Sequence, residues 1–223
     1  MLSIVIPTLD ATPSLKRAID AVADENFVGE VIVADGGSAD GTPEVARDLG
    51  ARVIEAPRGR GPQLAAGAQV ARGNWLLFLH ADTVLATGWG AAAAAFMSNL
   101  ANAERAAVFR FALDDTGLAA RRLARMVAWR TRVLGLPYGD QGLLIGRGFY
   151  DRLGGYRPIV LMEDVDLVRR IGRCRLTLLD VPAVTSAERY AREGYVRRGA
   201  RNLTCLGLYF LGVPPETILK IYR

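Results

Sequence analysis

The sequence has few cysteines, a single histidine and no apolar run long enough to cross a membrane. Its two cysteines, Cys174 and Cys205, lie outside any Cys-x-x-Cys pattern, which argues against a disulfide framework and against a structural zinc site. The longest late apolar stretch, residues 203–213, falls short of the roughly 20 residues that a spanning helix needs. The first residues lack a basic segment and reach Pro7 early, so they predict a strand rather than a secretion signal. We therefore expect a cytoplasmic protein.

The chain also lacks a lysine-rich tail, although its net charge is +5. The excess is arginine scattered over several segments, so nucleic acid is not required and we expect none as a partner. Two arginine clusters, at 121–132 and 189–201, are interleaved with Trp129, Tyr190 and Tyr195. Such clusters suit the phosphates of a nucleotide, an acceptor or a lipid surface, and they also suit a solvated face.

What the sequence does contain is an alternation of apolar runs and amphipathic segments. Runs that are apolar on both faces, separated by helical patterns, are typical of a mainly parallel sheet covered by helices. With 223 residues, of which 51% are apolar, one α/β domain is the simplest organisation. We expect strands at 2–6, 31–34, 52–55 and 75–79, helices that open at Thr12 and Thr42, and a helix at 62–71.

Beyond Thr83 the alternation loosens, but no linker or repeat marks a second domain. We therefore expect a single domain over residues 1–223, with a nucleotide-binding half at about 1–83 and a second half at about 84–223. In the second half we expect helices at 90–96 and 118–134, a helix that opens at Glu163, strands at 107–113, 142–145 and 176–181, and a helical tail.

Polar residues follow three of the predicted strands, in the segments 7–10, 35–42 and 80–83. Ligands bind beyond the carboxyl ends of parallel strands, so these segments should converge on one edge of the sheet. Known phosphate-binding motifs do not fit, because Thr42 occupies the lysine position of a phosphate loop and Leu64 the last glycine of a Gly-x-Gly-x-x-Gly motif. Asp35 lacks the second carboxylate of a phosphatase-type nucleophile.

The pair His80 and Asp82 suggests a divalent cation. In an extended segment residues i and i+2 point the same way, so both side chains can address one point while Ala81 stays small between them. A carboxylate oxygen suits Mg²⁺ or Mn²⁺, particularly when substrate phosphates complete the shell. The alternative is a hydrogen-bonded core histidine followed by a loop-capping aspartate.

An ordered series of motifs resembles the family 2 glycosyltransferases, which have a GT-A fold. The series runs from residue 4 to residue 167, and each motif alone is weak. The stretch 59–68 is most similar to small bacterial members that accompany radical-SAM and selenium-related domains. The motifs are Ile4-Val5-Ile6-Pro7-Thr8, Val33-Ala34-Asp35-Gly36-Gly37-Ser38-Ala39-Asp40-Gly41-Thr42, Leu77-Phe78-Leu79-His80-Ala81-Asp82-Thr83, Gly139-Asp140-Gln141-Gly142 and Glu163-Asp164-Val165-Asp166-Leu167.

The resemblance implies a three-layer α/β/α sandwich with a mixed, mostly parallel sheet and a nucleotide sugar over its strand ends. It places Asp35 at the base or ribose, Arg60 at the diphosphate, and Asp82 as the ligand that bridges Mn²⁺ or Mg²⁺ to the diphosphate. His80 stands where many relatives have an aspartate, and we expect it to hydrogen-bond ribose or phosphate with little metal contact. The implied donor-binding residues are Pro7, Thr8, Asp35, Arg60, Gln63, His80 and Ala81.

The resemblance also implies inverting transfer to an acceptor hydroxyl. Such a displacement needs a general base on the face of the sugar opposite the leaving group, and the similarity places Asp164 in that role, with Glu163 on the acceptor side. Asp140 and Gln141 become candidates for binding sugar hydroxyls. Alternatively, the carboxylates from Glu163 onward complement a helix dipole, and Asp140 is a plain turn residue.

The helix at 118–134 and the tail at 190–209 could bind an acceptor or rest on the anionic inner face of a membrane. Core packing with a solvated rim is the favoured interpretation. The predicted core face is Ala119, Leu123, Met126, Val127, Val133 and Leu134, with Arg121, Arg122 and Arg125 outside it.

The sequence therefore predicts a metal-dependent hexosyltransferase that uses a UDP- or GDP-sugar. A nucleotidyltransferase is an alternative, although its glycine-rich, lysine-bearing signature is absent. A non-catalytic nucleotide-sugar binder is another, although Asp82 and Asp164 argue against it. The acceptor and the oligomeric state are left open.

Overall fold

A computed structural model describes residues 1–222. Strands and helices alternate through its first part as the apolar runs predict. Strand β1 is buried along its whole length, because neighbouring strands flank it and helices cover it. The elements are β1 (Leu2–Thr8), α1 (Thr12–Ala23), β2 (Val28–Asp35), α2 (Thr42–Asp48), β3 (Arg52–Glu55), α3 (Arg60–Val70) and β4 (Trp75–Phe78).

The second part contains four further strands and most of the helices. The predicted helices at 90–96, 118–134 and from Glu163 are all present, and the predicted strand at 176–181 extends to Thr185. The elements are β5 (Thr83–Leu85), α4 (Trp89–Ser98), η1 (Leu100–Asn102), β6 (Ala106–Leu113), α5 (Leu118–Leu134), η2 (Gly139–Gln141), β7 (Leu143–Gly146), α6 (Arg147–Arg152), α7 (Glu163–Ile171), η3 (Arg173–Arg175), β8 (Leu176–Thr185), α8 (Glu188–Glu193), α9 (Tyr195–Phe210) and α10 (Pro215–Tyr222).

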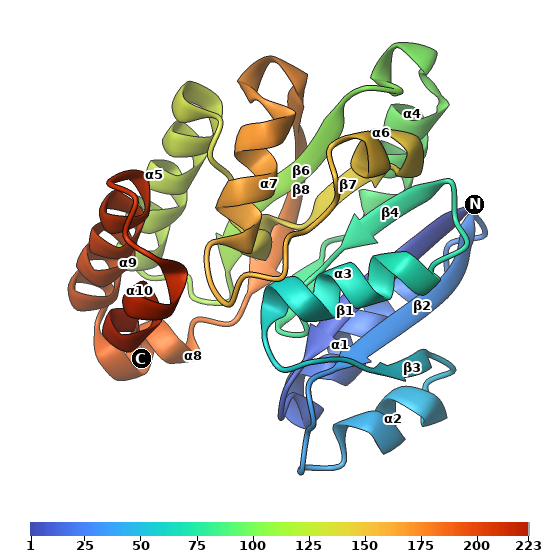
Figure 1. Cartoon of the computed structure of the whole chain (residues 1–223), viewed down its shortest axis with the longest axis horizontal. Helices are drawn as coiled ribbons and strands as arrows, with labels where there is room; N and C mark the ends of the chain where they lie inside the picture. The colour runs from blue at the N-terminus through green and yellow to red at the C-terminus, as the bar shows by residue number, and fades with distance from the viewer. Residues whose placement is uncertain (223) are drawn as a thin grey trace.

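One mixed sheet of eight strands runs through both parts of the chain (Figure 1), in the order β3-β2-β1-β4-β7-β6-β8-β5. Strand β1 pairs in parallel with β2 and β4, and β2 pairs in parallel with β3. Strand β7 lies antiparallel between β4 and β6 and joins the first four strands to the rest. The carboxyl ends of β1, β2 and β4 therefore meet at one edge, where the sequence places its polar segments.

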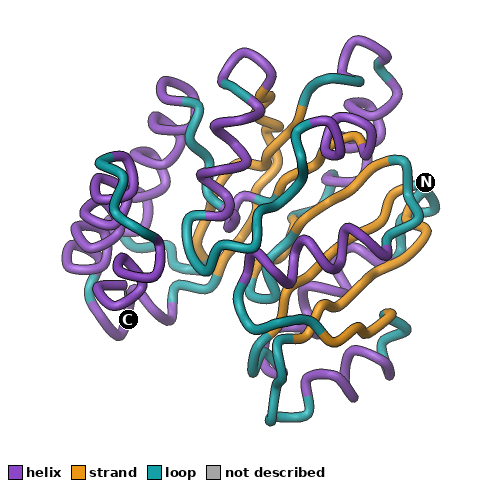
Figure 2. The backbone as a smooth tube through the Cα atoms, viewed as in Figure 1, coloured by secondary structure: helices purple, strands orange, loops and turns teal. Residues whose placement is uncertain are grey.

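Helices cover both faces of the sheet, and each face has its own apolar core. On one face, Ile19 of α1 packs in the same core as Trp89 of α4. On the other face, Leu64 of α3, Phe149 of α6 and Leu167 of α7 share a second core. Figure 2 shows the strands between these helices. The predicted three-layer α/β/α architecture is confirmed.

Helices α5, α8, α9 and α10 gather beyond one end of the sheet (Figure 1), and we call them the helical module. A third core joins the module to α7 through Val165, Cys205, Leu206 and Ile218. Within residues 1–222, no helix is both long and apolar enough to cross a membrane.

Helix α5 has its predicted bounds but turns a different face to the protein. Val127 and Thr131 are buried, and the Thr131 hydroxyl donates to Gln141 Oε1 at 2.9 Å. This contact turns the opposite side outward, so Met126, Val133 and Leu134 are 42%, 41% and 49% exposed. The prediction that these three residues pack into the core is wrong.

Candidate active site

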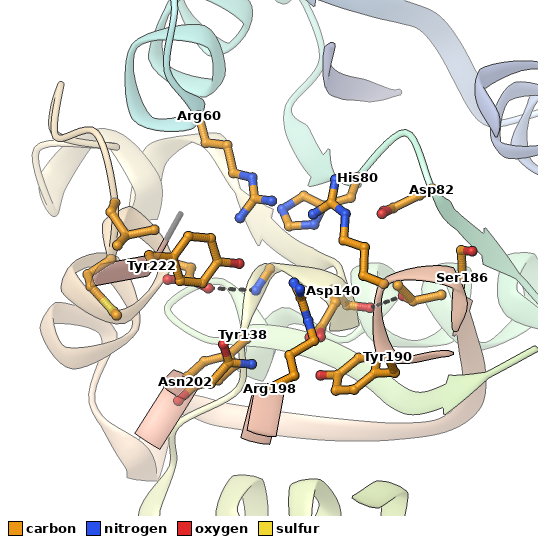
Figure 3. Close-up of a pocket in the computed structure, with 16 residues that line it drawn as sticks. Arg60, His80, Asp82, Tyr138, Asp140, Ser186, Tyr190, Arg198, Asn202 and Tyr222 are labelled. Atoms are coloured by element: carbon orange, nitrogen blue, oxygen red, sulfur yellow. Dashed lines mark hydrogen bonds between the residues drawn. The ribbon is translucent and has the colours of Figure 1, made fainter. Parts of the chain in front are cut away.

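Two cavities adjoin at the carboxyl ends of β1 and β4. The larger has a volume of about 590 Å³ and the smaller about 100 Å³. They share one wall, and Figure 3 shows the smaller cavity with Arg60 and Arg198 reaching into it from opposite sides. The residues of the shared wall are Arg60, His80, Asp82, Leu161, Arg189 and Tyr222.

The larger cavity lies between the end of β1, the start of α3 and the segment after β4. Pro7, Thr8, Gln63 and Ala81 line it together with the shared wall. Its volume is within the range of roughly 300–1,000 Å³ that is typical of small-molecule sites. The structure thus brings most of the predicted donor-binding residues to one cavity.

Asp35 is buried and is not among the residues that line either cavity. Its Oδ1 accepts from the hydroxyls of Thr8 (2.8 Å) and Ser38 (2.5 Å), and its Oδ2 accepts from the backbone N–H groups of Gly37 (3.0 Å) and Ser38 (2.8 Å). Burial alone would raise the pKa of Asp35, but these hydrogen bonds lower it. The carboxylate has no lone pair left for a ligand, so its contacts are those of a brace between two loops.

Gln63 is a second brace beneath the larger cavity. Its side-chain nitrogen donates to the carbonyl oxygens of Thr8 at 2.6 Å and of Ala34 at 2.8 Å. Both amide hydrogens are therefore committed to the ends of β1 and β2, which they hold side by side. The residue lines the cavity, but its polar contacts serve the backbone.

Arg60 enters the shared wall from the first residue of α3. A Cβ on Gly61 would lie 2.4 Å from the carbonyl oxygen of Ile159, so only glycine lets this end of α3 approach the segment before α7. Burial would lower the pKa of Arg60, but the carboxylates of Glu163, Asp164 and Asp82 raise it. The guanidinium is a permanent cation between the two cavities.

His80 lies beside Arg60 and is neutral at physiological pH. Burial and the positive charges of Arg60 and Arg189 together lower the pKa of His80 to about 3, against the opposing effect of Asp82. The ring packs closely on the next loop, because a Cβ on Gly139 would lie 2.5 Å from His80 Nε2. The backbone N–H of Gly139 donates to Asp164 Oδ2 at 2.8 Å. Gly139 thus connects the imidazole to the carboxylate of Asp164.

Asp140 and Asp164 line the smaller cavity. Burial raises the pKa of Asp140 to about 6 despite the neighbouring cation of Arg130, and its Oδ1 has no hydrogen-bond partner. Asp164 lies in the first turn of α7, two residues after Met162, whose φ of 66° places it in the left-handed region. Such a backbone conformation is uncommon for a non-glycine residue and is often found at functional sites.

Glu163 and Gln141 are not among the residues that line either cavity. Glu163 is 2% exposed. Burial and the charge of Asp164 raise its pKa to about 7, against the effect of Arg60. Gln141 is 1% exposed, and its side-chain nitrogen donates to the carbonyl oxygen of Phe109 at 2.9 Å. Gln141 therefore joins α5 to β6, and its direct contact with a sugar stays a prediction.

Several residues of the smaller cavity were not predicted individually. Tyr190, Arg198 and Asn202 come from the helical module, and Tyr222 comes from its last described turn. Arg198 is 6% exposed, pairs with Glu193 at 2.8 Å and leaves its Nε without a partner. In the sequence, the cluster of arginines and tyrosines at 189–201 could have pointed to Tyr190 and Arg198. No sequence pattern pointed to Asn202 or Tyr222.

The coordination shell of a metal ion at this site would have to be completed by the substrate. Within residues 1–222, no group of three or more His, Cys, Asp or Glu side chains could hold an ion. Asp82 supplies one carboxylate at the wall shared by both cavities. This fits Mg²⁺ or Mn²⁺, which often bind through one or two carboxylates, waters and substrate phosphates.

A model of the family described as Glycosyl transferase family 2 matches residues 3–143. A PGL/p-HBAD biosynthesis glycosyltransferase of Mycobacterium tuberculosis is 37% identical over 93 residues, which are 38% of this chain and 36% of that protein. The succinoglycan biosynthesis protein ExoO of Rhizobium meliloti is 38% identical over 84 residues, 35% of this chain and 24% of that protein. The chain thus matches only about a third or less of the length of these curated relatives.

Solved structures of glycosyltransferases share the fold. The mannosyltransferase PcManGT from Pyrobaculum calidifontis, in complex with GDP-Man and Mn²⁺, has a TM-score of 0.67 at 18% identity, over 92% of this chain and 60% of that one. Glucosyl-3-phosphoglycerate synthase from Mycobacterium tuberculosis, in complex with Mn²⁺, UDP and glucosyl-3-phosphoglycerate, has a TM-score of 0.61 at 19% identity, over 96% and 81%. At these identities the likeness shows the fold alone.

Proposed function

The chain belongs to glycosyltransferase family 2, and we propose that it transfers a sugar from a nucleoside-diphosphate sugar to an acceptor hydroxyl with inversion. The observation that carries this proposal is the pair of adjoining cavities. A donor in the larger cavity would bring its diphosphate to the shared wall of Arg60, His80 and Asp82, and its sugar to the smaller cavity that Asp164 lines.

We propose a UDP- or GDP-sugar as the donor, because solved structures of this fold contain UDP or GDP-Man. Pro7 and Thr8 line the larger cavity and are proposed to contact the nucleoside. Asp35 and Gln63 are proposed to act through the shape of this cavity, since their polar atoms brace its walls. Contact of these two side chains with the donor is not required.

The diphosphate would lie against positive charge. Arg60 and Arg189 line both cavities and can stabilise the negative charge that develops on the leaving oxygen. Asp82 would hold Mn²⁺ or Mg²⁺, and the ion, when bound, supplies further neutralisation of the leaving diphosphate. Neutral His80 can donate one hydrogen bond to a ribose or phosphate oxygen.

Asp164 is proposed as the general base. The acceptor oxygen forms a bond to the anomeric carbon as the bond to the diphosphate oxygen breaks, and the acceptor proton passes to the Asp164 carboxylate. The N–H groups of Gly139 and Val165 donate to its two oxygens at 2.8 and 2.7 Å, which orients the carboxylate. Asp140, with an unpartnered Oδ1 in the same cavity, is proposed to bind a sugar hydroxyl.

Thermal shift against a panel of UDP- and GDP-sugars, with and without Mn²⁺, tests the donor assignment. A ligand at 100 times its Kd stabilises a protein by about 2.7 kcal/mol, so the correct nucleotide should raise Tm by several degrees. Asp82→Asn should remove the part of the Tm increase that depends on Mn²⁺. Failure of every nucleoside diphosphate to stabilise the protein in the presence of metal would contradict the proposal.

His80→Asp tests the role of the imidazole. The substitution adds a negative charge beside Asp82 and should tighten Mn²⁺ binding in titrations with donor present. Unchanged metal affinity would contradict the placement of His80 next to the cation. Pyrophosphate exchange with a nucleoside triphosphate would instead indicate a nucleotidyltransferase.

A further inference from the structure

The side of α5 that faces away from the protein is apolar and exposed. Leu118, Met126, Trp129 and Val133 are 72%, 42%, 56% and 41% exposed. At 3.6 residues per turn these four side chains fall within a sector of about 80° around the helix, opposite the buried Val127. Large apolar side chains gathered on one side of a helix usually have a partner.

Arginines lie within and beside this apolar sector. Arg121, Arg122, Arg125 and Arg132 are exposed, and α5 contains no acidic residue. Within residues 1–222, none of these four arginines forms an ion pair. Exposed arginines elsewhere, such as Arg47 and Arg152, do pair with carboxylates. We call these four arginines and the four apolar residues the α5 outer face.

We propose that the α5 outer face docks onto an anionic membrane surface. An amphipathic helix with tryptophan and leucine beside arginines lies in the lipid interface, where apolar side chains enter the acyl boundary and arginines meet phosphate headgroups. The positive charge of the face complements an anionic bilayer. This proposal does not depend on the identity of the donor or of the base.

Other occupants fit this face less well. A second copy of the chain would bring arginines against arginines, because the face has no carboxylate to pair with them. Nucleic acid would meet the four cations but would leave the exposed Trp129, Met126 and Val133 side chains without apolar contacts. A lipid surface satisfies both kinds of side chain at once.

The α5 outer face belongs to the same part of the molecule that lines the smaller cavity. Helix α5 ends at Leu134 and leads through Gly135 to Tyr138, which lines the smaller cavity. The helical module that carries the face also supplies Tyr190, Arg198 and Asn202 to that cavity. Docking through α5 would hold this part of the site close to the membrane.

Trp129 makes the proposal directly measurable. Of the three tryptophans, Trp89 is buried, Trp75 is half-buried and Trp129 is 56% exposed. A blue shift of tryptophan emission on addition of vesicles should therefore come from Trp129. Vesicles of phosphatidylcholine with phosphatidylglycerol should bind the protein and shift its emission, whereas pure phosphatidylcholine vesicles should do neither. Binding should weaken as salt is added.

A charge-matched pair of variants tests the face itself. Each arginine near an anionic surface contributes about a five-fold factor, so loss of the four outer-face arginines should weaken vesicle binding at least 100-fold by co-sedimentation. The control removes the same charge from α1, α2, the segment before β4, and α6, and it should bind like the parent protein. The test variant is R121Q/R122Q/R125Q/R132Q, and the control is R17Q/R47Q/R72Q/R152Q.

A tryptophan pair separates insertion from charge attraction. Trp129→Phe should retain binding and lose the emission shift, whereas Trp129→Ala should also weaken binding roughly ten-fold. All of these side chains are exposed, so unchanged thermal melting is expected to show that the variants fold. The proposal is overturned by absence of binding to anionic vesicles, or by equal losses in the test and control variants. It is also overturned if the parent protein self-associates or binds duplex DNA but does not bind vesicles, and the four-arginine variant loses that self-association or DNA binding.

Discussion

The two halves of the molecule differ in how their buried polar groups are satisfied. In residues 1–83, Asp35 accepts four hydrogen bonds and Gln63 donates two. Among residues 1–222, buried side-chain nitrogen and oxygen atoms without a hydrogen-bond partner occur only after residue 83. They belong to Arg130, Asp140, Glu163, Arg198, Arg201 and Asn202.

This difference indicates that one cavity is preformed and the other is incomplete. A buried polar atom without a partner costs roughly 1–3 kcal/mol, and proteins retain such atoms mainly where a ligand or water meets them. Asp140, Arg198 and Asn202 all line the smaller cavity. The first half therefore holds its shape by its own contacts, whereas the second half keeps buried polar atoms without partners at a cavity.

The halves also differ in charge. Residues 1–83 contain seven basic and eleven acidic side chains, whereas residues 84–223 contain twenty-one basic and twelve acidic ones. The net positive charge of the protein thus comes entirely from the second half. Such a field attracts anionic ligands and surfaces to the second half.

Asp164→Asn should produce the largest effect and would place the chemistry in the second half. An amide cannot accept the acceptor proton, so transfer should fall roughly 10³-fold while the donor, held by the other half, binds as before. Sugar transfer and donor titration measure the two quantities. The exposed Asp180→Asn is the control. Loss of donor binding would remove Asp164 from the role of base.

Asp35→Ala tests the preformed character of the first half. It removes all four hydrogen bonds of a buried carboxylate and should lower the free energy of unfolding by about 3 kcal/mol. Asp35→Asn should cost only about 1 kcal/mol, because the Thr8 and Ser38 hydroxyls can turn to accept from the amide. Urea unfolding measures both. Equal effects of the two substitutions would argue against the brace.

The folded-state pKa of Asp35 is lowered, so its stabilisation has a defined pH dependence. The contribution is fully present above the unfolded pKa near 3.9 and is lost as pH falls through the folded value. The wild-type protein should therefore lose more stability below pH 4 than the Asp35→Asn variant.

Gly139→Ala tests one contact between the halves, the one at the shared wall of the cavities. The new Cβ would lie 2.5 Å from His80 Nε2, and overpacking of this kind costs about 1–3 kcal/mol. In the His80→Ala background the space is free, so the same substitution should be nearly neutral. A double-mutant cycle on urea unfolding measures the coupling. Equal losses in both backgrounds would show that His80 and Gly139 do not contact one another.

Asp140→Asn should have the smallest effect on the free energy of unfolding. It should raise this free energy, whereas the Asp35 substitutions lower it. Burial raises the pKa of Asp140 to about 6, so its ionisation destabilises the fold as pH rises from about 4 to 6. The variant should be more stable than wild type at pH 7 by about 1 kcal/mol and should lose this pH dependence. Thermal melts across this range provide the test, and a less stable variant at pH 7 would contradict the raised pKa.

The prediction from sequence succeeded where local patterns dominate. Strands β1, β2 and β4 contain short runs that are apolar on both faces, and helix α5 begins and ends at its predicted residues. The polar segments after β1, β2 and β4 were expected at one edge because parallel strands align their carboxyl ends. His80, Asp82, Asp140 and Asp164 do line the cavities there.

The sequence by itself determined the order of strands and helices up to β4, the family, and which polar residues follow those strands, because these depend on local periodicity and motif order. It did not predict β5 or α6. Only the tertiary structure decided which of those residues have free atoms. Hydrogen bonds from Thr8 and from its own loop occupy the Asp35 carboxylate, and Thr131 and Phe109 occupy the Gln141 amide. By contrast, Arg198, Asn202 and Tyr222 reach the cavity through the packing of the helical module. The tertiary structure also decided which side of α5 is exposed. The helix has apolar residues on more than one side, and the side that packs against β6 and Gln141 is the buried one.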